Sequence, residues 1–94
     1  MTAHYVFGDV VQSRAGHDCG RLFVVMADEQ DGYALLCDGR LRTIDKPKRK
    51  KAKHIVLVGG VPRFEKCAEY PKMLDAHIKK HLDFCRSLCY NKEV

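Results

Sequence analysis

The segment Asp45–His54, DKPKRKKAKH, concentrates most of the charge chemistry that this sequence can offer. It holds six cationic side chains and one acidic one, a net charge of +5. The whole chain of 94 residues has 17 Lys and Arg against 12 Asp and Glu, so the other 84 residues balance. A charge excess confined to one segment indicates a partner surface more than general solubility. Three interpretations compete: a solvated linker, a targeting signal, and a surface that binds polyphosphate. The six cations are Lys46, Lys48, Arg49, Lys50, Lys51 and Lys53.

A second segment, Ser13–Arg21, has the residue types of a loop that lets an anionic ligand approach the backbone. Gly16 and Gly20 stand four residues apart and permit positive φ, and Arg14 and Arg21 flank them. Taken alone, a glycine pair between strands is usually turn chemistry. Arginine can bond two phosphate oxygens or stack on a base, whereas lysine acts as a point charge. Phosphate binding explains both basic segments, which a targeting signal alone does not.

Five short strands are expected to position these segments, at residues 9–13, 22–27, 33–37, 41–44 and 54–58. Asp38-Gly39 lies between the third and fourth of them and predicts a type I′ hairpin. The basic segment then forms a long loop within one sheet and not a linker between domains. None of its six cations is expected in the core. The number and spacing of the strands predict a mainly β fold, a small five-stranded barrel.

From Lys72 to Cys89 the apolar period becomes that of a helix. We expect this helix to pack on the barrel by its apolar stripe; the alternative is that the stripe is exposed and joins a partner or a second copy. The expected organisation is a barrel over residues 1–58, followed by a linker and the helix over residues 59–94, monomeric when free. The stripe consists of Leu74, Ile78, Leu82, Cys85 and Cys89.

The stretch from Gly8 to Val25 reads G-D-V-V-x-S-x-A-G-x-D-x-G-R-L-F-V-V. It resembles the KOW motif, and the chain up to about Val58 is similar to bacterial KOW-domain RNA-binding proteins related to the large-subunit ribosomal protein of the archaeal and eukaryotic fourteen-e type. That family also shows a D-G-x-L-R hairpin and a K-P-K-x-K-K-x-K-H run, here Asp38–Arg42 and Lys46–His54. The resemblance implies a five-stranded SH3-like (KOW) barrel whose loops contact structured RNA. With the helix predicted from its apolar period, the expected fold is this barrel with a C-terminal α-helix. The RNA-binding residues that it implies are Arg14, Gly16, His17, Gly20, Arg21, Arg40, Arg42, Lys46, Lys48, Arg49, Lys50, Lys51, Lys53 and His54.

The sequence therefore predicts a non-enzymatic RNA-binding protein, associated with the ribosome or with rRNA. The basic segment contains no aromatic residue, which favours recognition of folded RNA by backbone and shape over stacking of single-stranded bases. The alternative is a KOW-type module that docks on a protein such as RNA polymerase or a ribosomal protein. No catalytic residues are expected, because the neighbours His17, Asp18 and Cys19 point to different sides and lack a third orienting group.

Histidines and cysteines on the predicted helix raise the alternative of a metal site. His77, His81, Cys85 and Cys89 recur every four residues, and Cys67 precedes them. All four on one helix cannot bind one ion, because Cα atoms twelve residues apart are separated by about 18 Å. No C-x-x-C pair is present, so we expect reduced thiols, no metal and no cofactor. Without an export signal or an apolar run of about 20 residues, a cytoplasmic protein that does not enter a membrane is expected.

Overall fold

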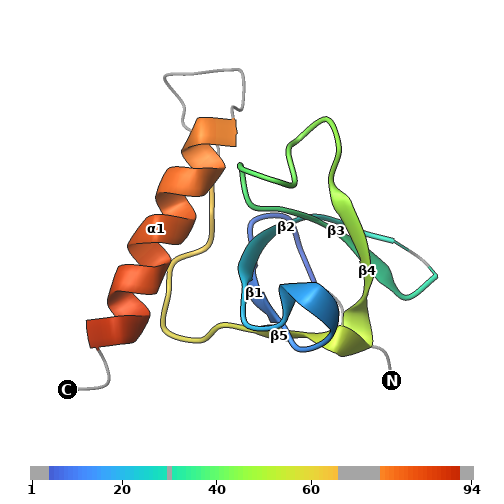
Figure 1. Ribbon diagram of the computed structural model, residues 1–94, viewed down its shortest axis with the longest axis horizontal. Helices are drawn as coiled ribbons and strands as arrows, with labels where there is room; N and C mark the ends of the chain where they lie inside the picture. The colour runs from blue at the N-terminus through green and yellow to red at the C-terminus, as the bar shows by residue number, and fades with distance from the viewer. Residues whose placement is uncertain (1–4, 30, 66–74, 92–94) are drawn as a thin grey trace.

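The computed structural model describes residues 5–29, 31–65 and 75–91, with residues 89–91 described in their backbone only. The described fold is mainly β, with five antiparallel strands in one sheet and a C-terminal helix (Figure 1). The elements are β1 (Val10–Ser13), η1 (Gly16–Asp18), β2 (Leu22–Asp28), β3 (Tyr33–Cys37), β4 (Lys48–Lys51), η2 (Ala52–His54), β5 (Ile55–Leu57) and α1 (Asp75–Asn91), where η1 and η2 are single 3-10 helical turns.

The strands lie in the order β4-β3-β2-β1-β5, so β5 returns to pair with the far side of β1. Val11 stands opposite Phe23 of β2 on one side and Leu57 of β5 on the other. The outer strands β4 and β5 are joined by the three residues of η2 alone. The sheet is therefore strongly curled, since its two edges must come within one short turn of each other (Figure 1).

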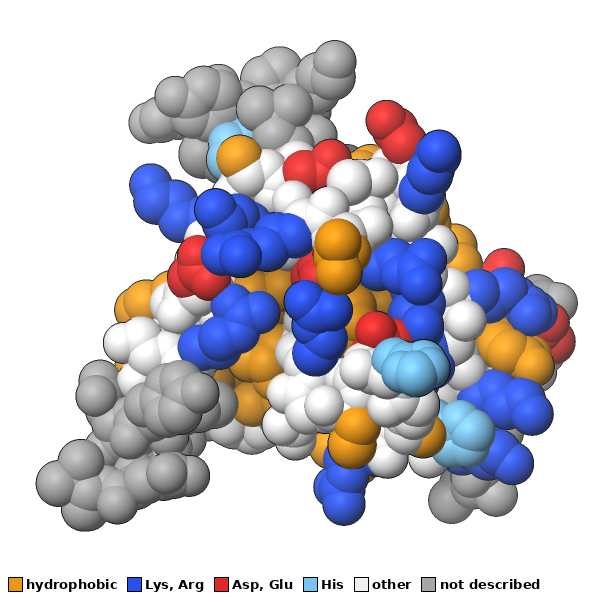
Figure 2. Space-filling model, in the orientation of Figure 1, with side chains coloured by type: hydrophobic (Ala, Val, Ile, Leu, Met, Phe, Trp, Pro, Cys, Tyr) orange, Lys and Arg blue, Asp and Glu red, His pale blue; other side chains and the backbone are white. Residues whose placement is uncertain are grey.

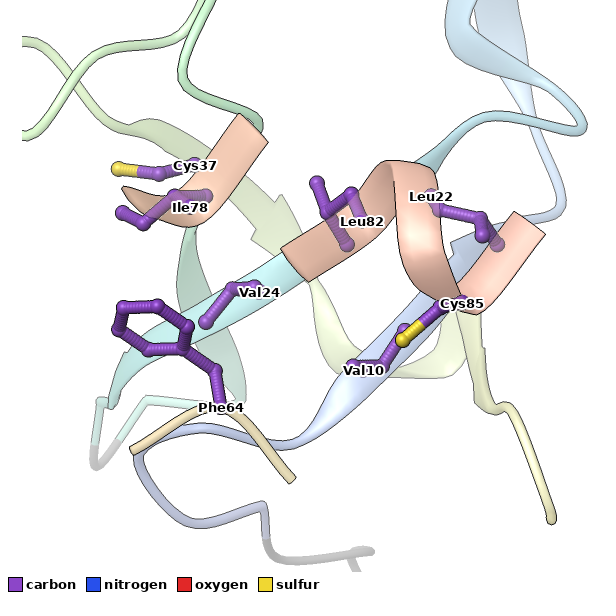
Figure 3. Close-up of a cluster of buried hydrophobic side chains, with 8 residues drawn as sticks. All are labelled: Val10, Leu22, Val24, Cys37, Phe64, Ile78, Leu82 and Cys85. Atoms are coloured by element: carbon purple, nitrogen blue, oxygen red, sulfur yellow. The ribbon is translucent and has the colours of Figure 1, made fainter. Parts of the chain in front are cut away.

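Both faces of the central strands are buried, which explains their nearly unbroken apolar sequence. Side chains alternate along β2, so Phe23 and Val25 point into the curl of the sheet while Leu22 and Val24 point to the opposite face. The cluster inside the curl contains Val11, Phe23, Val25, Ala34, Leu36 and Ile55. The cluster on the opposite face contains Val10, Leu22, Val24, Cys37, Phe64, Ile78, Leu82 and Cys85 (Figure 3).

Helix α1 covers the outer face of the sheet. Ile78, Leu82 and Cys85 of the predicted apolar stripe are each 0% exposed and face β1 and β2 (Figure 3). The predicted packing of the helix on the sheet is confirmed for these three residues. Leu74 and the side chain of Cys89 lie outside the described residues.

The strand predicted over residues 41–44 is wrong, and the fourth strand is Lys48–Lys51 of the basic segment. Asp38-Gly39 does not form a type I′ turn, because that turn needs a positive φ at both residues and only the glycine has one. Residues 38–47 instead form one long loop between β3 and β4. Strand β4 was not predicted because lysine has a low strand propensity. In the structure β4 is an edge strand that pairs with β3 alone. Charged side chains are common on such an edge strand, where they oppose aggregation.

Candidate nucleic-acid interface

The glycine-containing loop between β1 and β2 is fixed by backbone hydrogen bonds at its base. The amide of Gly20 donates to the carbonyl of Ser13 at 2.8 Å, and the amide of Ser13 donates to the carbonyl of Arg21 at 3.0 Å. The amide of Arg14 donates to the carbonyl of His54 at 2.8 Å, which ties this loop to η2. The positive φ expected at Gly16 and Gly20 is present, at 76° and 91°. The exposed arginine and histidine side chains of the loop are Arg14, His17 and Arg21.

Two lysines of β4 reach this loop and hold it. Lys50, expected to be exposed in a loop, is instead only 9% exposed, and its Nζ donates to the carbonyl of Ala15 at 2.7 Å. Lys48 forms an ion pair with Asp18, whose Oδ2 also lies 3.9 Å from the Nζ of Lys50. A Cβ added at Gly16 would lie 3.8 Å from the same Nζ, so the loop lies directly over Lys50. The two segments that stand out in the sequence therefore meet, and these two lysines are used to join them.

The pairing of Asp18 with the lysines of β4 was not predicted from the sequence, where Asp18 was considered only as a catalytic candidate. The hydrogen bond from Lys48 lowers the pKa of Asp18 most, partial burial opposes this, and the charges of Lys48, Lys50 and Arg42 lower it further. The carboxylate is therefore ionised at neutral pH and neutralises part of the basic segment. The available signal was its position, as the one acidic residue in a loop that is otherwise rich in glycine and basic residues.

Arg49 is occupied by carboxylates on the neighbouring β2–β3 turn. Its Nε donates to Oε1 of Glu29 at 2.8 Å, and its Nη2 forms an ion pair with Oδ2 of Asp31. The guanidinium lies 3.7 Å from the centre of the Tyr33 ring, a cation–π contact. Three of the six cations of the basic segment are thus engaged within the protein.

The remaining predicted cations are exposed. Figure 2 shows Lys and Arg side chains spread over one face of the molecule, from α1 across the loops to the region of β4. The side chains that make no hydrogen bond or ion pair with any residue that the structure describes are Arg14, Arg21, Arg40, Arg42, Lys46, Lys51 and Lys53. His54 is half-buried in η2. The structure thus divides the predicted set into residues that hold the scaffold and residues that are available to a partner.

The described cysteine and histidine side chains form no recognisable metal site. Among the described residues there is no group of three or more His, Cys, Asp or Glu side chains that could hold an ion. Burial, with smaller contributions from Asp75 and Asp38, raises the pKa of the Cys37 thiol to about 12, which makes it a poor metal ligand and nucleophile. His81 places Nε2 at 2.9 Å from the carbonyl oxygen of Pro62. Cys67 and the side chain of Cys89 lie outside the described residues.

Neither a family model nor a curated protein matches this sequence. In the described part of the chain, no helix has both the length and the apolar character needed to cross a bilayer.

Proposed function

We propose that this protein is a non-enzymatic RNA-binding protein that grips the phosphate backbone of structured RNA. The observation that supports this proposal is the set of seven exposed cations named above, whose side chains make no hydrogen bond or ion pair with a described residue. They lie on the β1–β2 loop, on loop 38–47, at the end of β4 and in η2. The nearby carboxylate of Asp18 is already paired with Lys48, and those of Glu29 and Asp31 with Arg49. The uncompensated positive charge is therefore directed to solvent, where a polyanion can reach it.

The chemistry of the free side chains suits phosphate. The lysines supply point charges to phosphodiester oxygens, and the arginines supply planar forks that can bond two oxygens. The loops that carry them are ordered by backbone hydrogen bonds and by Lys50, so little additional ordering is needed on binding. Charge alone does not distinguish RNA from DNA. The resemblance to KOW-domain proteins favours RNA, and among RNAs it favours rRNA. The corresponding location is the cytoplasm.

The finer fold that accompanies this proposal is an SH3-like (KOW) barrel. The strong curl of the five-stranded sheet and the single 3-10 turn between β4 and β5 support it. The KOW-like Gly8–Val25 stretch forms β1, η1 and most of β2, and its glycine loop lies against the basic β4. We take the protein to be a monomer when free, since its own sheet covers the described part of the apolar stripe of α1.

Exposed apolar residues on β5 favour a second candidate function, docking on a protein of the transcription or translation machinery. Val56 is 37% exposed and Leu57 58% exposed. Such a partner would use apolar contacts, which salt and polyanions weaken far less than phosphate contacts. Competition with heparin separates the two candidates, because heparin displaces RNA from a cationic surface and leaves an apolar protein interface largely intact.

The test is a salt titration of binding to a fully paired RNA hairpin, followed by fluorescence anisotropy. If about four of the seven free cations reach phosphates, log affinity falls against log salt with a slope of roughly −3 to −4. Heparin should then compete with the hairpin. The absence of binding at low salt, or binding that does not change with salt, would contradict the proposal.

A further inference from the structure

Loop 38–47 presents one exposed apolar side chain between two arginines. Leu41 is 70% exposed, more than the other large exposed hydrophobic residues of the described chain, which are Val6, Val56, Leu57 and Phe84. Arg40 and Arg42 on either side are also exposed. Removal of a leucine side chain from water is favourable, and at Leu41 this contribution is unused. A ligand that used it together with the arginines would need an apolar surface next to negative charge.

The tip of this loop is held in one conformation by Asp38, which is 5% exposed. Its Oδ1 accepts hydrogen bonds from the amides of Arg40 and Arg42, both at 2.9 Å. Its own amide donates to the carbonyl of Arg42 at 2.9 Å, and the amide of Gly39 donates to the same oxygen at 3.2 Å. Leu41 is therefore presented on a closed loop, and a ligand would not have to order it.

Helix α1 fixes this loop against the rest of the molecule. Gly39 has φ of 78°, and a Cβ at this position would lie 2.3 Å from the carbonyl oxygen of Asp75 and 2.8 Å from the amide nitrogen of Lys79. The loop backbone thus packs directly on the first turns of the helix, and only glycine fits there. Oδ1 of Asp75 accepts a hydrogen bond from the amide of Ile44 at 2.7 Å, which anchors the loop at a second point.

We propose that Leu41 contacts an unstacked base of the RNA while Arg40 and Arg42 bind the phosphates beside it, with α1 serving as the platform that positions the loop. The inference rests on the proposed RNA binding and adds the feature that is recognised, a bulged or looped-out nucleotide. An unstacked base exposes an apolar face next to two phosphates, which is the combination that this loop matches. Leucine and other apolar side chains insert between base steps of kinked DNA, and sequence-specific recognition of RNA mostly targets loops and bulges whose bases are unstacked.

The experiment compares Leu41→Ala with Leu57→Ala, because both leucines are exposed and both substitutions remove the same atoms. Dissociation constants are measured for an RNA hairpin with one bulged nucleotide and for the same hairpin without the bulge. We expect the unaltered protein to prefer the bulged hairpin. Leu41→Ala should weaken binding to the bulged hairpin about fivefold, leave the paired hairpin unchanged and keep the salt slope. Leu57→Ala should change neither RNA.

The outcomes separate this inference from the proposed function. If the protein binds both hairpins with equal affinity, or if Leu41→Ala weakens both equally or neither, the base contact is wrong while RNA binding stands. If the unaltered protein binds neither hairpin, the proposed function fails and the inference fails with it. Both substitutions are at exposed positions, so a loss of folding is not expected to obscure the result.

Discussion

Lys50 and Lys51 are neighbours on β4, yet the structure gives them opposite environments. Lys50 is almost buried and donates to the carbonyl of Ala15, whereas Lys51 is exposed and has no side-chain partner among the described residues. The cause is the alternation of side chains along a strand, which turns Lys48 and Lys50 toward the glycine loop and Arg49 and Lys51 away from it. A run of lysines is therefore not a uniform surface: the strand register decides which lysines stabilise the fold and which remain available to a partner.

The largest expected effect is on stability, and the same substitution at the two neighbours measures it. Lys50→Met removes a charged hydrogen-bond donor from a nearly buried site, and we expect the free energy of unfolding to fall by about 1.5 kcal/mol. Lys51→Met alters an exposed side chain and should change it by less than about 0.5 kcal/mol. Urea denaturation of both variants checks this. Equal losses at the two positions would contradict the claim that Lys50 stabilises the fold and Lys51 does not.

A smaller effect is expected from acid, through the carboxylate that faces the inward lysines. The pKa of Asp18 is lowered in the folded protein, so its contribution to stability is complete above the ordinary value of 3.8 and is lost as the pH falls through the lower, folded value. Asp18→Asn should therefore melt below the unaltered protein at neutral pH, and the difference should shrink below about pH 3.8. Melting temperatures measured across this range provide the check. A difference that stays constant down to the lowest pH would show that the ionised carboxylate does not hold the loop.

The apolar parts of this fold could be predicted because buried positions recur in the sequence with the period of a strand or a helix. Strands β1, β2, β3 and β5 and the buried face of α1 follow from alternating or helical apolar patterns, which the structure confirms within one or two residues for the strands. Strand β4 could not be predicted, since its four residues are all cationic and its pairing with β3 is a tertiary event. The turn at Asp38 was mispredicted because the carboxylate caps the loop locally, an arrangement that an Asp-Gly pair does not reveal.

The residues of the candidate site were predicted, but not which of them stabilise the fold and which remain available to a partner. Gly16, Gly20 and the basic segment were identified by residue type and by the resemblance to the KOW motif, and the structure brings them together. Which lysines remain free depends on Asp18, which is 30 residues away from Lys48 in sequence, and on the carboxylates opposite Arg49. Such pairings are fixed by the register of the sheet, which the charge pattern does not encode.

The most direct measurement is the salt dependence of RNA binding for the double variants Lys51→Gln/Lys53→Gln and Lys51→Arg/Lys53→Arg. The first removes two free charges and the second keeps them at the same two positions, with each side chain exposed in the unbound protein. If these lysines contact phosphates, the slope of log affinity against log salt should become shallower by about 1.8 in the glutamine variant and stay unchanged in the arginine variant. A glutamine variant that binds the hairpin with the affinity and slope of the unaltered protein would contradict phosphate binding by the outward lysines.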